Sequence, residues 1–168
     1  MDGRRYKLAH GTNGYIVSFI PATEFIEVKN MYKAMGFKEA VATRKVFLLN
    51  EETGTRETCF DDSALMGYEN FSFMKQGGRY ECKIKLFGRL GLPEDSDLLA
   101  CTVLERRVPF GVRKLAKVQV GQDIYYIPER ELEGVGDVDV IYYSSSRRDL
   151  IQVDNVLHAN CHNPIFAD

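Results

Sequence analysis

The sequence lacks the long apolar segments that mark membrane and exported proteins. No run approaches the roughly 18 apolar residues that a membrane span needs. The first residues, MDGRRYKLAHGTNG, carry charge but no apolar core of the kind found in signal peptides. We therefore expect a protein that does not associate with membranes and that resides in the cytoplasm.

Cysteine is sparse, with four residues among 168 and no CxxC pair. Secreted scaffolds held by disulfides are usually shorter and richer in cysteine. We therefore predict four free thiols in a reducing compartment. They are Cys59, Cys82, Cys101 and Cys161.

Recognised catalytic motifs are missing as well. The chain has no phosphate-binding glycine loop, no GxSxG elbow, no HExxH and no kinase motif set. We expect no cofactor. The one local cluster with metal-binding chemistry is His158, Cys161 and His162, for which His10 could supply a fourth ligand. Three interpretations stay open for it: a polar segment without chemistry, a metal site, or a site in which Cys161 acts as a nucleophile beside a histidine.

The composition is that of an ordinary globular protein. Apolar residues make up 45% and charged residues 27% of the chain, and the net charge is −2. We expect a single domain over residues 1–168, because each half looks too small for a core of its own. Residues 88–97, rich in Gly, Pro and acids, form either a surface loop or a weak boundary between lobes.

The predicted fold class is α+β, a mainly antiparallel sheet with one amphipathic helix packed on it. The helix is expected over residues 22–35, where apolar residues recur at helical spacing. They are Phe25, Val28, Tyr32 and Met35. Residues 146–157 are expected to form a second helix, because Ser146 and Asp149 resemble a capping box.

The clearest strand signal is a hairpin around Gly77 and Gly78, between strands at 71–75 and 79–87. Alternation places Cys82 and other apolar residues of the second strand on the buried face, and Lys83 and Lys85 on the opposite face. Further strands are expected at 14–20, 40–49, 56–60, 117–120, 124–127 and 137–143, while residues 98–107 fit helix or strand equally well.

Charge is unevenly distributed along the chain. Residues 75–117 contain ten Lys or Arg and five Asp or Glu, whereas residues 118–168 contain three and nine. Such a split favours self-association or an acidic protein partner. The candidate interface combines the basic stretch 105–117 with exposed aromatic residues. It consists of Arg106, Arg107, Phe110, Arg113, Lys114, Lys117, Tyr142 and Tyr143.

These observations favour a non-enzymatic structural or protein-interaction subunit of a larger assembly. A viral or phage assembly protein, incorporated in a virion, is one form of this hypothesis. Two alternatives remain open: a small enzyme of unrecognised family with a site near His158, Cys161 and His162, and a nucleic-acid-binding regulator that uses residues 105–117.

Overall fold

The computed structural model describes residues 30–66 and 70–167, and within them the chain is built almost entirely of strands. Four 3₁₀ helices (η), each of three or four residues, are the helices of this described part. The elements in chain order are β1 (Met31–Glu39), β2 (Arg44–Asn50), β3 (Arg56–Asp61), η1 (Ser63–Met66), β4 (Arg79–Leu90), β5 (Leu98–Phe110), β6 (Arg113–Val120), β7 (Asp123–Pro128), η2 (Glu129–Leu132), β8 (Val140–Val153), β9 (Val156–Leu157), η3 (Ala159–His162) and η4 (Pro164–Phe166).

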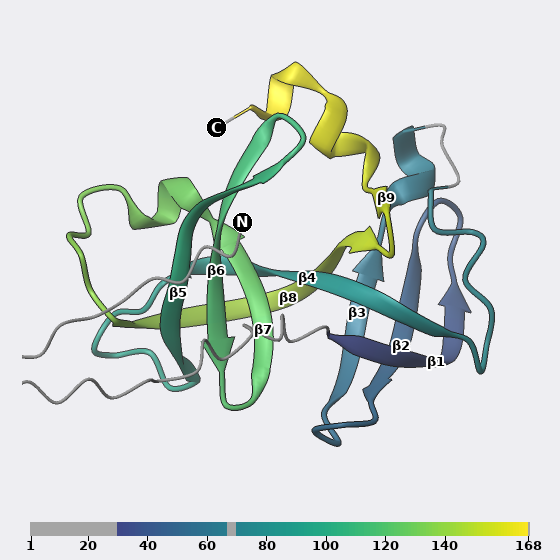
Figure 1. The fold of residues 1–168 in the computed structure, drawn as a ribbon, viewed down its shortest axis with the longest axis horizontal. Coiled ribbons are helices and arrows are strands. Elements are labelled where there is room, and N and C mark those ends of the chain that lie inside the picture. The colour runs from purple at the N-terminus through teal and green to yellow at the C-terminus, as the bar shows by residue number, and fades with distance from the viewer. Residues whose placement is uncertain (1–29, 67–69, 168) are drawn as a thin grey trace, which may run out of the picture.

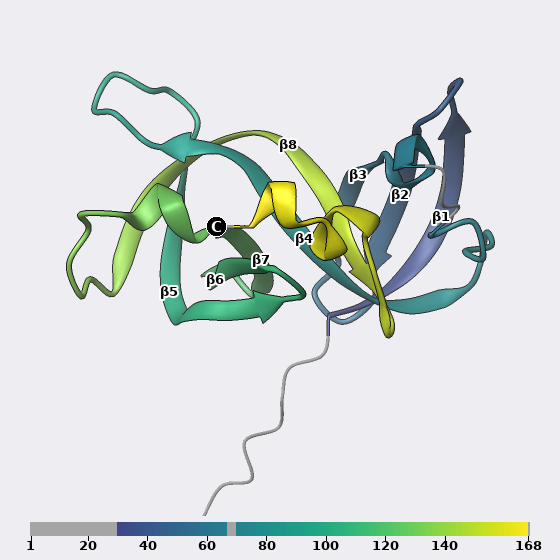
Figure 2. The same ribbon diagram turned by 90° about the horizontal axis from the view of Figure 1, so that it is seen from above.

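The long strands β4 and β8 pair antiparallel and cross the molecule between two three-stranded meanders (Figure 1). One meander is β1–β2–β3 and the other is β5–β6–β7. Each meander closes onto the central pair at both ends, so that β4 and β8 belong to two closed rings of strands. Ring 1 is β4–β1–β2–β3–β8, and ring 2 is β4–β7–β6–β5–β8. Figure 2 shows the two rings on either side of the central pair.

The two rings have the same connectivity, although the sequence shows no repeat. The first strand of each meander pairs antiparallel with the long strand that follows it, β1 with β4 and β5 with β8. The third strand pairs parallel with the other long strand, through Phe60 and Asp149 in ring 1 and through Lys85 and Tyr126 in ring 2. A 3₁₀ helix follows the third strand in both units. The fold is therefore two interlocked copies of one β-β-β-η-β unit.

The main hydrophobic core takes side chains from both rings, with Tyr32, Ile84, Val118 and Leu150 among its buried members. A smaller cluster lies in ring 2 beneath the C-terminal segment. It consists of Phe110, Leu115, Ile124, Tyr126, Ile151 and Cys161. All four cysteines are buried free thiols, as predicted.

The predicted helix over residues 22–35, and with it the α+β class, is wrong. Residues 22–29 lie outside the described part, and from Met31 the chain forms strand β1. Tyr32 and Ala34 are fully buried while Met31 and Met35 are exposed, which is the alternation of a strand. The helical spacing was a coincidence, because pairing with β2 and β4 satisfies the backbone of this segment.

The second predicted helix, over residues 146–157, is also a strand. β8 continues unbroken through Ser146 to Val153 and pairs with β4 over most of its length. The apolar residues here are those that favour strands, and Leu150, Ile151 and Val153 are buried. The segment that fitted helix or strand equally well is part of β5.

The predicted hairpin around Gly77 and Gly78 is right in its turn and second strand and wrong in its first strand. A turn does lie at Gly77 and Gly78, and Gly77 has a φ of +83°, which glycine adopts without strain. The second arm is β4, with Cys82 buried as expected. The first arm, residues 71–75, forms turns, and the partners of β4 are β1, β7 and β8.

Within the residues that the structure describes, no helix has the length and apolar character to cross a membrane.

Candidate anion site

A hollow of about 250 Å³ lies in ring 2, where the C-terminal segment passes over β4, β6 and β8. Charged and polar side chains make up much of its wall. The lining residues with charge or hydrogen-bonding capacity are Asp62, Lys85, Arg113, Arg130, Arg147, Asp149, His158, Asn160 and Cys161. Apolar residues complete the wall, and among them Ile165 and Phe166 of the C-terminal segment are exposed.

Arg113 is the distinctive residue of this hollow. It is the first residue of β6 and is only 9% exposed. Its Nε is buried and has no hydrogen-bond partner among the described residues. A buried guanidinium normally contacts a carboxylate or a carbonyl oxygen, because removing a charge from water is costly. Arg113 therefore lines the hollow with a cationic side chain whose Nε donor is unused by the described residues.

The β5–β6 turn holds Arg113 in place. Gly111 has a φ of +59°, and a Cβ on it would lie 2.0 Å from the carbonyl oxygen of Cys161. Val112 donates its backbone N–H to the same carbonyl over 2.8 Å. The turn is therefore pressed against η3, an approach that only glycine permits at this position.

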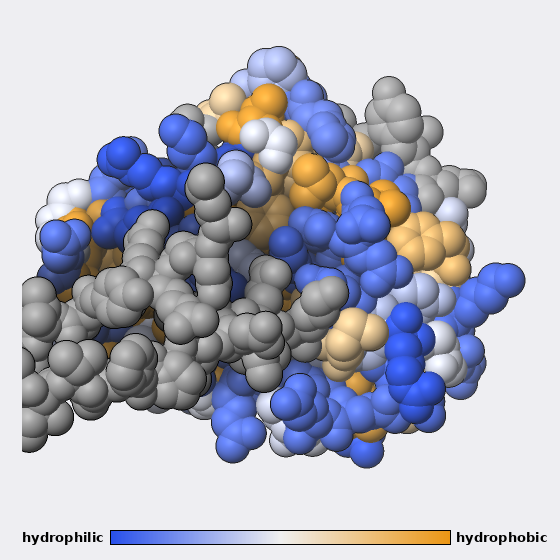
Figure 3. All heavy atoms as spheres, viewed as in Figure 1, coloured by the Kyte–Doolittle hydropathy of each residue, from blue (hydrophilic) through white to orange (hydrophobic). Residues whose placement is uncertain are grey.

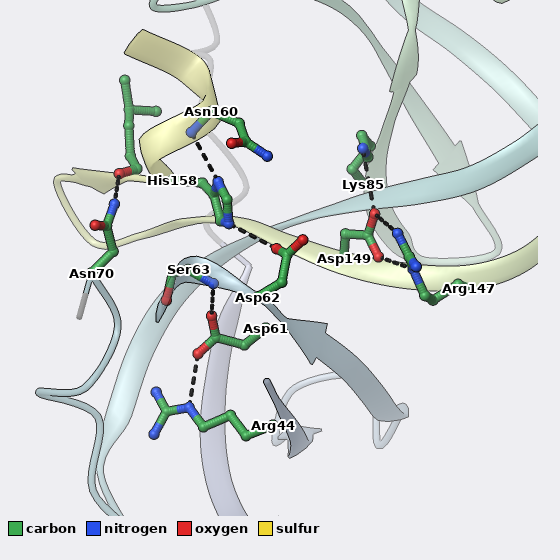
Figure 4. A network of polar contacts seen from close by, with 11 residues as sticks. Arg44, Asp61, Asp62, Ser63, Asn70, Lys85, Arg147, Asp149, His158 and Asn160 are labelled. Atoms are coloured by element: carbon green, nitrogen blue, oxygen red, sulfur yellow. Dashed lines mark hydrogen bonds and ion pairs between the residues drawn. The ribbon is translucent and has the colours of Figure 1, made fainter. Parts of the chain in front are cut away.

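Two further cations share one carboxylate in the wall of the hollow (Figure 4). Arg147 binds Asp149 through two hydrogen bonds, of 2.5 Å from Nε and 3.0 Å from Nη2. Lys85 Nζ lies 3.4 Å from Asp149 Oδ2. The Arg147 guanidinium also lies over the rings of Phe60 and Phe87, at 4.5 and 4.6 Å from their centroids. Burial lowers the pKa of Lys85 despite the opposing effect of Asp149.

His158 connects the C-terminal segment to the end of β3 (Figure 4). The backbone N–H of Asn160 donates to Nδ1 over 3.1 Å, so the ring hydrogen is on Nε2, which donates to Asp62 Oδ1 over 2.8 Å. This bond lowers the pKa of the Asp62 carboxyl. Both imidazole nitrogens are thus engaged.

The geometry around Cys161 differs from that of an activated thiol. The neighbouring His158 offers no ring nitrogen that could accept its proton. Burial raises the pKa of the Cys161 thiol, which favours the neutral form. His162 is exposed, and His10 lies outside the described residues. Within residues 30–66 and 70–167, no three His, Cys, Asp or Glu side chains are arranged as metal ligands.

The other predicted interface residues do not form one surface. Phe110 and Tyr143 are buried in the two cores, whereas Tyr142 is 59% exposed on the outer face of β8. Arg106 forms an ion pair with Glu129 at 2.6 Å. The remaining basic residues of the stretch, Arg107, Lys114 and Lys117, are exposed or half-buried.

Sequence reasoning named Arg113, His158 and Cys161 but missed most of the hollow. The missed residues are Asp62, Lys85, Arg130, Arg147, Asp149 and Asn160. They come from separate parts of the chain, and only the crossing of β4 and β8 brings them together. Lys85 in particular was predicted to lie on the face of its strand opposite the apolar one, and its side chain there is only 11% exposed.

Comparison with known proteins gives no match to a family model, to a curated protein or to a solved structure.

Proposed function

We propose that the protein is a non-enzymatic binding subunit that uses the basic hollow of ring 2 to bind an anionic group of its partner. The observation that carries this proposal is the buried Nε of Arg113, which has no hydrogen-bond partner among the described residues. The anion would replace the water that the guanidinium loses on burial. Hydrogen bonds of this charged type are the strong ones in proteins.

The surrounding charges support an anion in preference to a neutral ligand. The hollow is lined by the four cations Lys85, Arg113, Arg130 and Arg147 and by the two carboxylates Asp62 and Asp149. Asp149 is already shared by Lys85 and Arg147, and Asp62 binds His158. Neither carboxylate therefore serves Arg113, and an excess of positive charge faces the hollow.

The arrangement of His158 and Cys161 supports binding over catalysis. A nucleophilic thiol needs a base within hydrogen-bond reach and a lowered pKa. Here both nitrogens of His158 are occupied, and the pKa of Cys161 is raised by burial. The hollow instead offers fixed donors, which suit recognition of a ligand.

We also place the protein in a reducing compartment such as the cytoplasm. Its four cysteines are all buried free thiols, and intracellular proteins keep thiols in this state.

The direct test measures the protection of the folded protein by inorganic phosphate. We expect phosphate to raise the thermal midpoint relative to sodium chloride at equal ionic strength, because a ligand that binds only the folded state stabilises it. Arg113→Met should abolish this shift. Arg107→Met is the matched control, because Arg107 is an exposed arginine of the same β5–β6 pair and should leave the shift intact. Equal shifts in wild type and Arg113→Met would refute the proposal.

Light scattering separates the kinds of partner. If a second copy of this chain supplies a carboxylate to the hollow, phosphate should dissociate the oligomer. If the partner is another molecule, the mass should not change when phosphate is added.

A further inference from the structure

Building on this anion-binding function, we infer that the ligand is a phosphomonoester carried on a small hydroxylated compound, of the kind found in sugar phosphates. Three features of the hollow point to this class: its net charge, its unpaired acceptor, and its size with an apolar rim.

The charge of the lining matches that of a phosphomonoester. Four cationic and two anionic side chains line the hollow, which leaves an excess of two positive charges. A phosphomonoester carries a charge of about −1.5 to −2 at pH 7. A single carboxylate would neutralise only half of that excess. The buried guanidinium of Arg113 can also bind two phosphate oxygens at once through its fork of N–H groups.

The unpaired acceptor indicates what the rest of the ligand must offer. Asn160 Oδ1 is buried in the wall and receives no hydrogen bond from the described residues. The partly exposed Asp62 carboxylate lines the same hollow. The phosphate group of a phosphomonoester dianion has no hydrogen to donate to these oxygens. A hydroxyl on the carbon skeleton would satisfy them, because a hydroxyl donates one hydrogen bond.

The dimensions and the rim favour an organic phosphate over the free ion. A single water needs roughly 10–15 Å³ of such space, and the hollow offers about 250 Å³. Ile165 and Phe166 line it while remaining 83% and 40% exposed. In Figure 3, orange apolar spheres lie among hydrophilic ones near the top of the molecule, where Figure 1 draws the C-terminal segment. This apolar rim is placed to cover the carbon skeleton of a bound ligand.

The experiment compares four probes by titration calorimetry at constant ionic strength: inorganic phosphate, glucose 6-phosphate, glucose and citrate. We expect glucose 6-phosphate to bind at least about tenfold more tightly than inorganic phosphate, which corresponds to about 1.4 kcal/mol. Citrate, which carries carboxylates, should bind more weakly than either phosphate. Glucose alone should show no binding.

Substitution at Asn160 tests whether its Oδ1 accepts a hydrogen bond from a hydroxyl of the ligand. Asn160→Ala should lower the affinity for glucose 6-phosphate by a larger factor than the affinity for inorganic phosphate. Asn155→Ala is the control, because Asn155 is an exposed asparagine in the β8–β9 turn. A thermal scan of each variant shows whether it is folded before titration.

The outcomes distinguish this inference from the proposed function beneath it. The inference of a phosphomonoester ligand is refuted if glucose 6-phosphate binds no more tightly than inorganic phosphate, or if citrate binds as tightly as the phosphates. Either result leaves the proposed anion site in place. If Arg113→Met binds every probe as wild type does, the anion site itself is refuted.

Discussion

Arg44 and Arg113 each begin the middle strand of their meander, β2 in ring 1 and β6 in ring 2. The two side chains meet different surroundings. Arg44 Nε donates to Asp61 Oδ2 over 2.7 Å, and its Nη2 donates to the carbonyl of Phe71. The Arg44 guanidinium also lies over the ring of Phe37, at 4.7 Å. Arg113 Nε is buried and has no acceptor among the described residues.

This difference separates an arginine with an internal counter-ion from one for which we propose a binding role, within a single fold. In ring 1 the counter-ion is Asp61, which neutralises the charge of Arg44 within the protein. In ring 2 the described residues supply no acceptor to Arg113 Nε, and under the proposed function the folded protein bears the energetic cost of burial until an anion binds. The same location in two copies of one unit would then serve stability in one copy and recognition in the other.

The largest effect is expected when Arg44 is made to resemble Arg113. Asp61→Asn removes the carboxylate from a buried ion pair and should lower the free energy of unfolding by about 3–5 kcal/mol. Chemical denaturation measures this loss. Asp137→Asn, at an exposed position, should change stability by less than about 0.5 kcal/mol. A loss below about 1 kcal/mol for Asp61→Asn would show that Phe71 alone satisfies Arg44.

A second comparison concerns the turn that positions Arg113. Gly111→Ala combines the cost of a positive φ with a clash against the carbonyl of Cys161, and should destabilise the fold by about 2–4 kcal/mol. Gly54→Ala in ring 1 has a similar φ of +77° but open space around the added Cβ. It should cost only about 1 kcal/mol. Equal losses of stability would mean that η3 yields to the added methyl group.

The Arg113→Met substitution should have the opposite sign to Asp61→Asn. It removes a largely buried guanidinium that has no ion pair with the described residues and keeps much of the apolar volume, so the free energy of unfolding should rise by about 1 kcal/mol in phosphate-free buffer. Urea denaturation without and with phosphate measures the change in the free energy of unfolding in each buffer. A loss of stability in phosphate-free buffer would indicate that Arg113 already has a stabilising partner within the protein.

The smallest effect is a pH dependence carried by Asp62. Its carboxyl pKa is lowered from 3.8 by the hydrogen bond from His158. Its contribution to stability is therefore fully present above the ordinary value and is lost as the pH falls through the lowered pKa of the folded state. Asp62→Asn should flatten the dependence of stability on pH below about pH 4, where denaturation curves can be compared with those of wild type. An unchanged slope would assign the acid sensitivity to other carboxyls.

The sequence predicted local features of the fold better than its class. The alternation in β4 identified Cys82 as buried because a period of two is visible along a single strand. The segment around Tyr32 was misassigned because the pairing of β1 with β2 and β4, which decides which of its side chains face inward, is not visible in the local spacing of apolar residues. The continuation of β8 through three serines depends on β4, which supplies partners for its backbone. The residues of a single segment do not reveal such pairing between distant strands.

The candidate site was predictable only in part. Arg113 was identified from a basic stretch, but its burial depends on the turn at Gly111 meeting Cys161, two segments far apart in the sequence. Lys85 was placed on the face opposite the apolar one, and alternation alone cannot show that this face of β4 is covered as well. Side chains that converge from separate strands leave no signal in the spacing of residues.

The sharing of β4 and β8 has a consequence for the order in which the protein can form during synthesis. The first meander and β4 leave the ribosome before β8, yet β8 supplies the strand that closes ring 1 through Phe60 and pairs along β4. Until then the edges of β3 and β4 offer unpaired backbone groups to other chains. We therefore expect the nascent protein to depend on chaperones until β8 has emerged, and truncation before Val140 to yield an aggregating product even though every strand of the first meander is present.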